Sequence, residues 1–312
     1  MHKTTIYAAL CALCTTIATN ALATDVVVSI KPLHALVSGV MGETGEPYLM
    51  VTGAASPHTY QMRPSEAKAL SGADLVVWIG EGMETFLDRP IANLGSDADV
   101  LTLHEVAGME LLPTREGGIW SDEDPEVHMD EHDDHGHEHD EFDMHVWLDP
   151  GNARRIVEVV ADALVRIDPE RAGIYRGNAE EMRMRIDILE TSLGVQLAPV
   201  RQQAFIVFHD GYRYFEHAFD LNSKGAVAVD PARPPGARRL AELRNALVEH
   251  DVRCVFAEPQ FEPDLIQTVI EGSTVRTASL DPLGADVESG PDAWFEMMRG
   301  LGDAVAGCLG GA

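Results

Sequence analysis

Short apolar runs and helical segments alternate along the first third of the chain. Runs rich in β-branched residues, such as the one at residues 24–30, are typical of buried strands. Strands are predicted at residues 24–30, 48–51, 74–79 and 99–103, and helices at residues 32–41, 64–71 and 86–94. Strands that alternate with helices at this spacing indicate parallel βαβ units. The pattern therefore predicts an α/β fold.

One long helix is predicted in the middle of the chain. An amphipathic helix over residues 153–167 precedes Asp168-Pro169-Glu170, which combines a capping residue, a proline at the first helical position and an acid in the first turn. The next proline is Pro199, so we expect a single helix over residues 169–197. Its place at mid-chain makes it a candidate connector between two domains.

The alternation of strands and helices returns after the long helix. Strands are predicted at residues 204–208, 226–229, 253–257 and 274–280, and helices at residues 236–250, 263–271 and 291–309. A length of 312 residues suits two domains that each have a core. We therefore predict an N-terminal α/β lobe over residues 24–168, a connecting helix over residues 169–197 and a C-terminal α/β lobe over residues 198–312.

Residues 116–143 interrupt this pattern with histidines among acidic residues. Twelve Asp or Glu residues lie between Asp122 and Asp143. The five histidines among them are His128, His132, His135, His137 and His139. A segment so poor in aliphatic residues cannot offset its ordering entropy, which predicts a mobile loop. Histidine-rich tracts commonly bind metal, so we expect a secondary metal site here, the alternative being a solvated acidic loop.

The N-terminus has the features of a secretory signal peptide. Lys3 gives a positive start, residues 6–18 form an apolar run, and Ala21-Leu22-Ala23 is a cleavage site of the A-x-A type. Residues 1–23 are therefore expected to be removed after Ala23, although a buried N-terminal helix is an alternative. No later run approaches about 18 apolar residues, so we expect a soluble periplasmic protein without membrane insertion.

Composition and charge narrow the range of partners. The hydrophobic content of 45% is typical of a globular chain, and the formal net charge is −28. Nucleic-acid binding requires a basic surface, so this charge argues against a nucleic-acid partner and against anionic membrane surfaces. A field of this sign favours cations as ligands.

Two cysteines remain once the signal peptide is removed, Cys254 and Cys308. An even pair in an exported protein favours a disulfide, which would tie the C-terminal tail to the strand at residues 253–257. Two free buried thiols are the alternative. A metal site made of cysteines is disfavoured because residues 24–312 contain no CxxC spacing.

Three histidines and one aspartate lie at or near the ends of predicted strands. His58 follows the strand at residues 48–51, His145 comes directly after the histidine-acid loop, His209 ends the strand at residues 204–208, and Asp281 follows the strand at residues 274–280. Ligands of open α/β sheets bind at the carboxyl ends of strands. Three imidazoles with a carboxylate or water form a tetrahedral zinc site. Taken singly, a histidine near a strand end is more often a structural or surface residue, and Asp281-Pro282 could equally start a turn.

Six segments, taken in order, carry a family resemblance. They are GASPHTYQMRPS, ADLVVWIGEGME, DMHVWLDP, VFHDGYRYF, FAEPQF and LDPLG. Together they closely resemble the metal-binding solute-binding proteins of ABC importers, the cluster A-I family, and its zinc-uptake branch fits best. The resemblance covers essentially all of the chain after the signal peptide. It implies two (β/α) lobes with parallel sheets, joined by one long rigid helix, with the metal site in the cleft between the lobes.

The resemblance also implies a ligand set and a role. The ligands would be His58, His145 and His209, and zinc is favoured because manganese members carry Glu at the third position. Some zinc members use a Glu where this chain has Pro57, so we expect Asp281 as the fourth ligand, with water as the alternative. The zinc branch also has a disulfide at positions like Cys254 and Cys308. The implied role is capture of Zn²⁺ by a monomer, which delivers it to an ABC importer permease in the inner membrane.

Three other functions compete with zinc delivery. A manganese-binding protein of the same family is the nearest alternative. A zinc-dependent hydrolase also uses three histidines, but the sequence has no H-E-x-x-H, no G-x-S-x-G and no Walker A motif. An adhesin or a metal-buffering protein without an importer is the third. We expect a protein that is not an enzyme.

Overall fold

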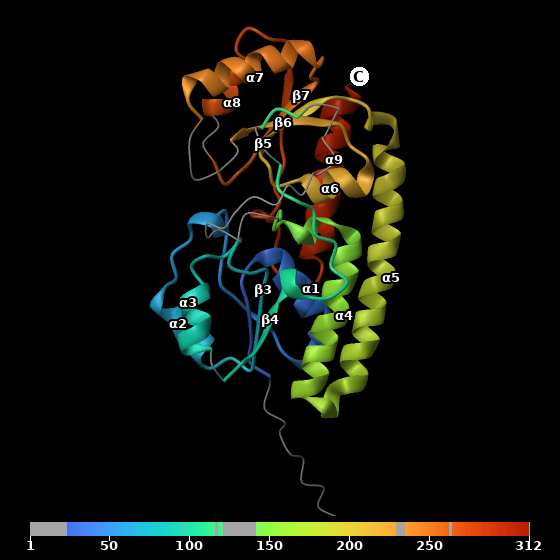
Figure 1. Cartoon of the computed structure of the whole chain (residues 1–312). Helices are drawn as coiled ribbons and strands as arrows, with labels where there is room; N and C mark the ends of the chain where they lie inside the picture. The colour runs from blue at the N-terminus through green and yellow to red at the C-terminus, as the bar shows by residue number, and fades with distance from the viewer. Residues whose placement is uncertain are drawn as a thin grey trace, which may run out of the picture.

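The computed structural model describes residues 24–95, 97–115, 118–120, 142–228, 235–261 and 264–311. Within them, two four-stranded parallel sheets, each flanked by helices, form two lobes stacked one above the other (Figure 1). The predicted α/β class and its parallel sheets are confirmed. The predicted signal peptide and the five histidines of the loop lie outside the described residues.

The N-terminal lobe has the strand order β2-β1-β3-β4. Its strands are β1 (Val26–Val28), β2 (Tyr48–Leu49), β3 (Leu75–Trp78) and β4 (Asp99–Thr102), and its helices are α1 (Lys31–Met41), α2 (Pro64–Ser71) and α3 (Asp88–Leu94). Val26 and Val28 pack into one apolar core, whereas Val27 faces a second core on the other side of the sheet. Burial on both faces explains why the strands are continuous apolar runs.

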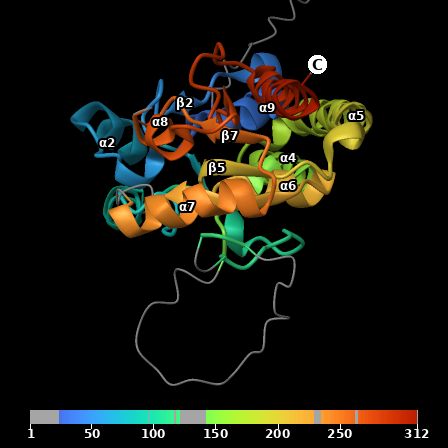
Figure 2. The same ribbon diagram turned by 90° about the horizontal axis from the view of Figure 1, so that it is seen from above.

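The C-terminal lobe repeats the architecture with the order β6-β5-β7-β8. Its strands are β5 (Phe205–His209), β6 (Ser223–Ala228), β7 (Cys254–Ala257) and β8 (Arg276–Ser279), and its helices are α6 (Arg213–Phe219), α7 (Ala237–Glu249), α8 (Asp264–Ile270) and α9 (Ala293–Gly310). Figure 2 shows α7 and α9 on opposite sides of β5 and β7. Helix α6 is the one element of this lobe that the sequence pattern did not predict.

The two long helices are α4 (Pro150–Ile167) and α5 (Ala172–Leu197). Asp149 caps α4, since its Oδ1 accepts a hydrogen bond of 2.6 Å from the backbone N–H of Asn152. Asp168 does not act as the predicted cap of a second helix, because its carboxylate accepts from Arg171 and from the Tyr175 hydroxyl instead. Residues Pro169–Arg171 form a 3₁₀ turn, and α5 begins after it.

Helix α5 runs along one side of both lobes (Figures 1 and 2). It packs against α1 and α4 of the N-terminal half and against α9 of the C-terminal half. One apolar core also extends from Val26 of β1 through Trp147 to Leu309 of α9. The lobes are therefore joined by a shared core as well as by the helix.

Hydrogen bonds from buried side chains cross between the lobes. The Lys31 ammonium donates to the carbonyl oxygens of Gly284, Ala285 and Val287, at 2.6, 2.9 and 2.8 Å. All three of its N–H groups thus have partners, which offsets the desolvation of the charge. The indole of Trp147 donates to the Pro282 carbonyl at 2.8 Å.

A disulfide joins Cys254 of β7 to Cys308 of α9, with their Cα atoms 6.1 Å apart. The predicted bridge is confirmed, and the alternative of two free thiols is not supported. The bridge fastens the last helix to the centre of the second sheet.

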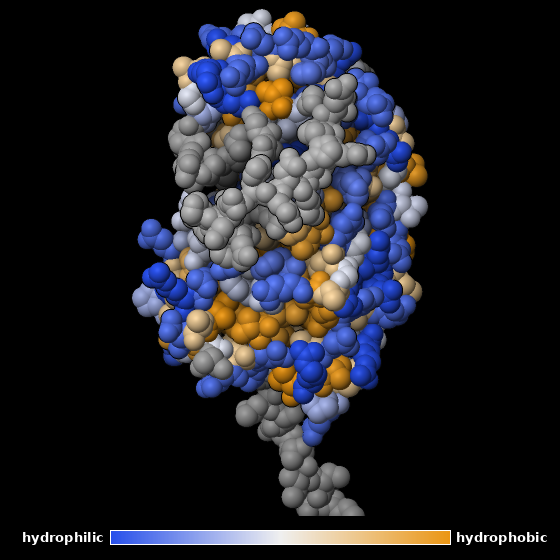
Figure 3. Space-filling model, viewed as in Figure 1, coloured by the Kyte–Doolittle hydropathy of each residue, from blue (hydrophilic) through white to orange (hydrophobic). Residues whose placement is uncertain are grey.

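The surface is polar over most of the C-terminal lobe in the view of Figure 3, with apolar residues gathered in patches lower down. Among the helices of the described residues, none is both long enough and apolar enough to cross a membrane.

Candidate metal centre

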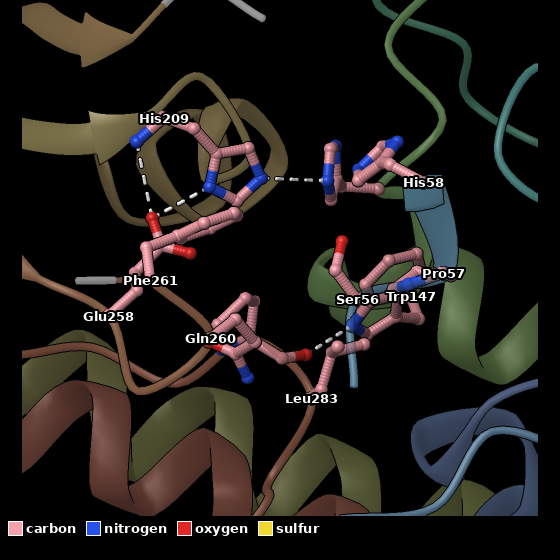
Figure 4. A pocket seen from close by; sticks show the side chains of 11 residues that line it. Ser56, Pro57, His58, Trp147, His209, Glu258, Gln260, Phe261 and Leu283 are labelled. Carbon is pink, nitrogen blue, oxygen red and sulfur yellow. Dashed lines mark hydrogen bonds and ion pairs between the residues drawn. The ribbon is translucent and has the colours of Figure 1, made fainter. Parts of the chain in front are cut away.

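Three histidines that are far apart in sequence meet between the lobes (Figure 4). His58 lies in a 3₁₀ turn after β2 (Pro57–Thr59), His145 directly precedes another (Val146–Leu148), and His209 is the last residue of β5. One ring nitrogen of each lies within 4.8 Å of the others. Three of the four residues predicted for the cleft therefore come together.

The three imidazoles sit in an apolar pocket. Its walls include Pro57, Trp147, Phe261, Pro282 and Leu283. His145 and His209 are only 7% and 4% exposed, whereas His58 is half-buried. Apolar walls exclude water and strengthen the interaction of the histidines with any charge between them.

A carboxylate holds each of the two buried histidines from behind. Asp143 Oδ1 lies 2.7 Å from Nδ1 of His145, and Glu258 Oε1 lies 2.6 Å from Nδ1 of His209. An ionised carboxylate only accepts hydrogen bonds, so each Nδ1 carries a proton and each Nε2 faces the cleft. This arrangement orients both rings as ligands.

The two Nε2 atoms of His145 and His209 are 3.2 Å apart. Two nitrogens bound to tetrahedral Zn²⁺ at 2.0–2.1 Å are separated by about 3.3 Å. Two bare lone pairs would repel at this distance, so a proton on one Nε2 makes a hydrogen bond to the other, and a metal ion that binds both atoms would replace that proton. The pair is thus already spaced for a metal ion.

Gly211 keeps the space beside these nitrogens open. A Cβ at this position would lie 2.4 Å from Nε2 of His209 and 3.0 Å from Nε2 of His145. Real Cβ atoms do not approach so closely, so any other residue would displace the ligands.

The protonation of the histidines differs with their surroundings. Burial, followed by the charges of His145 and His209, lowers the pKa of His58 to about 3, so its ring is neutral at physiological pH. Burial also opposes a charge on His209, but the attraction of Glu258, Asp210 and Asp143 prevails and raises its pKa. A metal ion that binds Nε2 of His209 must therefore displace a proton from that atom.

Asp281, expected as the fourth ligand, is not part of the histidine group. Its Oδ1 accepts from the Gln260 amide at 2.8 Å and from the backbone N–H of Leu283 at 3.1 Å, while Oδ2 accepts from the backbone N–H of Ala285. The carboxylate is thus occupied in shaping the turn that follows β8.

Sequence reasoning did not identify Asp143 or Glu258 as site residues. Both lie in segments that carry the family resemblance: Asp143 stands two residues before His145 in DMHVWLDP, and Glu258 stands in FAEPQF. Each has one buried oxygen, Asp143 Oδ2 and Glu258 Oε2, without a hydrogen-bond partner among the described residues. Of the two residues, Glu258 lines the pocket, so its free oxygen can accept a hydrogen bond from a ligand or water there.

Comparison with known proteins agrees with this geometry. The family model for the periplasmic component A of the zinc-uptake complex (ZnuA) matches residues 26–308. The high-affinity zinc uptake system protein ZnuA of Brucella abortus (strain 2308) is 41% identical over 304 residues, which cover 91% of each chain. The protein of the same name from Yersinia pestis is 33% identical over 300 residues, which cover 93% of this chain and 92% of that one.

A solved structure shares the fold as well. The crystal structure of a ZnuA protein superposes with a TM-score of 0.76 at 25% identity and covers 92% of this chain and 99% of that one. From the family match, the two relatives and the three convergent histidines, we conclude that the chain belongs to the ZnuA family of periplasmic zinc-uptake components.

Proposed function

We propose that this chain captures Zn²⁺ in the periplasm with His58, His145 and His209 and delivers it to an ABC-type zinc importer. The observation that carries the proposal is the pair of Nε2 atoms, 3.2 Å apart, whose rings are each fixed by a carboxylate at Nδ1. Members of the family share a role in zinc uptake, and they act as binding proteins and not as enzymes.

The chemistry of the pocket favours zinc over manganese. All three ligands of the group are nitrogens, whereas Mn²⁺ prefers carboxylate and carbonyl oxygens. Asp143 and Glu258 place two negative charges behind neutral imidazoles, which balances one divalent cation. We therefore retain zinc as the cargo and manganese as the weaker ligand.

The fourth position around zinc goes to a water molecule in this proposal. Glu258 lines the pocket, and its Oε2 can accept a hydrogen bond from such a water. Asp281 could ligate only by giving up its hydrogen bonds to Gln260, Leu283 and Ala285. A water is also easily displaced when the metal is handed over.

The remaining steps concern the cell. The permease and ATPase of the importer are the partners that a zinc-uptake complex requires. Within this proposal, the signal peptide is cleaved after Ala23, and the protein works as a monomer. The histidine-acid loop gathers zinc in weak, fast sites and raises its concentration near the cleft.

Substitution of the histidines tests the ligand set. We expect His58→Ala, His145→Ala and His209→Ala each to lower the zinc affinity of the cleft at least tenfold, because each removes one coordinate bond. His217→Ala is the matched control, since that side chain is 57% exposed and belongs to α6. Competition with a chelating dye strong enough to keep weak sites empty measures the affinity. One tight zinc per chain in all three variants would refute the assignment.

A further inference from the structure

A buried arginine lies behind the third zinc ligand. The Arg115 guanidinium donates from Nε to Asp210 Oδ2 at 3.1 Å, from Nη2 to Asp210 Oδ1, and from Nη1 to Glu216 Oε2 at 2.8 Å. The guanidinium also lies over the Trp120 ring, 3.5 Å from its centroid. Bidentate pairing of a guanidinium with a carboxylate fixes the orientation of the carboxylate as well as its distance.

Asp210 connects this arginine to the metal centre. It directly follows His209, and the next residue is Gly211, whose N–H donates to the His209 carbonyl at 2.8 Å. Gly211 lies so close to both buried histidines that an added Cβ would collide with their rings. A shift of the Asp210 side chain therefore moves the turn that aims His209 into the cleft.

Arg115 reaches this turn from the other half of the chain. It belongs to a stem, defined as residues 112–115 and 118–120, which follows the N-terminal sheet but lies against the C-terminal one (Figure 1). Ile119 pairs with Gly225 of β6, and the Trp120 N–H donates to the Lys224 carbonyl at 3.1 Å. The stem thus lies antiparallel to the edge strand β6 and is bonded to it through an isolated bridge.

The same stem also contacts the support of His145. The backbone N–H of Leu112 donates to the Tyr214 hydroxyl at 3.0 Å, and that hydroxyl donates to the Asp143 carbonyl at 2.7 Å. Asp143 in turn holds His145. One segment is therefore linked both to Asp143, which holds His145, and to Asp210, which directly follows His209, and it contributes a positive charge at Asp210.

We propose that Arg115 is a positioning residue for zinc, which sets the separation of His145 and His209 through Asp210. This inference rests on the proposed function and deepens it. Asp210 and Glu216 are two carboxylates beside a single arginine, so loss of Arg115 leaves them to repel each other. The turn that carries His209 then shifts, and the two Nε2 atoms lose the spacing that suits tetrahedral zinc.

Arg115→Gln, Arg115→Lys and a matched control test the proposal in the full chain. The control is Arg154→Gln, because Arg154 also pairs with two carboxylates, Asp187 and Glu190, on the α4–α5 surface. We expect Arg115→Gln to weaken tight zinc binding about tenfold. This is the lower end of the loss of metal affinity seen when residues that hold metal ligands in place are replaced. Arg115→Lys should restore part of the affinity because the charge is kept.

Bound Co²⁺ supplies a readout that lost stability alone would not change. Its visible absorption reports ligand geometry, so Arg115→Gln should alter the spectrum while Arg154→Gln leaves it unchanged. If Arg115→Gln binds zinc and Co²⁺ as the wild type does, while His209→Ala does not, positioning by Arg115 is overturned and the proposed function stands. If His209→Ala also binds normally, the proposed function itself fails.

Gly225→Ala tests the stem without changing any charge, and it replaces Arg115→Gln should that variant not fold. A Cβ on Gly225 would lie 2.4 Å from the Gly118 carbonyl oxygen, so the stem must move away from β6. Gly300→Ala on α9, where no atom lies within 4 Å of the added Cβ, is the control. Weaker zinc binding in Gly225→Ala alone supports the proposal, and equal binding in both variants contradicts it.

Discussion

His145 and His209 differ from His58 in how their rings are held. The first two are buried and have a carboxylate at Nδ1, whereas His58 is half-buried in an exposed loop after β2. A cation entering the cleft therefore meets two fixed ligands and one that approaches from the N-terminal lobe. Protons should compete with zinc most strongly at His209, because His209 has the most negative surroundings of the three histidines.

The pH dependence of zinc binding follows from that difference. Because the pKa of His209 is raised above its usual value of about 6.5, zinc affinity should fall as the pH falls through that pKa. His58, with a pKa of about 3, should release no proton in this range. Titration calorimetry in buffers with different ionisation heats counts the protons released.

Glu258→Gln provides the matched comparison for the pH experiment. It removes the charge that raises the pKa of His209, so the affinity of the variant should depend less on pH, although its rings are held less well. Equal affinity of the wild type at pH 8 and pH 6 would exclude His209 as the competing group.

The role of Asp281 can be decided by Asp281→Asn. An amide nitrogen cannot accept the N–H of Ala285, so the turn after β8 should lose about 1–3 kcal/mol of stability. Zinc affinity should stay within about threefold, since the carboxylate is not a ligand in our proposal. The exposed Asp286→Asn is the control. An affinity loss as large as that of His209→Ala would instead identify Asp281 as a ligand.

The sequence identifies ligands better than it identifies their supports. His58, His145 and His209 are recognisable because each stands in a strand-end or loop motif that the family shares. Glu258 supports His209 only because β5 and β7 are neighbours in the sheet, and strand order cannot be read from the pattern of apolar residues. Asp281 also stands at a strand end, but the direction of its side chain depends on three backbone and amide donors nearby.

At the scale of elements, one buried carboxylate joins the ends of two strands. Glu84 Oε1 accepts from the Ser29 hydroxyl after β1 and from the Ile79 N–H after β3, while Oε2 accepts from the Gly80 N–H at 3.1 Å. Burial raises the pKa of Glu84 to about 7 in spite of these donors. The carboxyl is therefore close to its midpoint at physiological pH.

Glu84 should make the folded chain less stable as the pH rises. A carboxyl whose pKa is raised on folding binds more protons in the folded state, so its contribution is present below about pH 4.5 and is lost as the pH passes about 7. The loss amounts to roughly 3 kcal/mol. Urea unfolding at pH 5 and pH 8 should show this fall in the wild type.

Glu84→Gln should flatten that part of the pH profile, because the amide does not ionise. Glu43→Gln, at an exposed position on the same lobe, should retain the wild-type profile. A slope that is unchanged in Glu84→Gln would assign the effect to another group.

Element boundaries follow local chemistry where that chemistry is strong. Helix α2 begins at Pro64 and ends before Gly72, as the sequence pattern predicts. Helix α6 escaped prediction because it is only seven residues long and has no capping side chain. Burial of Tyr214, Phe215 and Phe219 in the core shared by the two lobes stabilises it as a helix, since its own sequence gives little local support.

At the scale of the whole molecule, the histidine-acid loop should affect the rate of zinc capture more than its strength. Deletion of residues 121–141 should slow zinc uptake from a competing chelator and leave the affinity of the cleft nearly unchanged, because the cleft ligands lie outside the deletion. Replacement of the five loop histidines by glutamine keeps length and acidity, so it separates metal binding from charge. Stopped-flow transfer at low zinc measures the rate, and equal rates would contradict a recruiting role.

The sequence predicts the two-lobe architecture, but not how tightly the lobes are joined. The ammonium of Lys31, a residue that the sequence analysis did not single out, is buried against three carbonyls of the turn after β8. Contacts of this kind join residues more than 250 positions apart, and no periodicity encodes them. Such contacts form only once the chain has folded and both sheets lie along α5.

The shared apolar core has a consequence for the lifetime of the protein. Because one core runs from β1 to α9, the stability gained when zinc binds in the cleft extends to the whole chain. A ligand present at a hundred times its dissociation constant adds about 2.7 kcal/mol of stability. Zinc-bound molecules should therefore resist proteases longer than zinc-free ones. Degradation in the cell would then remove zinc-free molecules first, so the amount of this protein would follow the zinc supply.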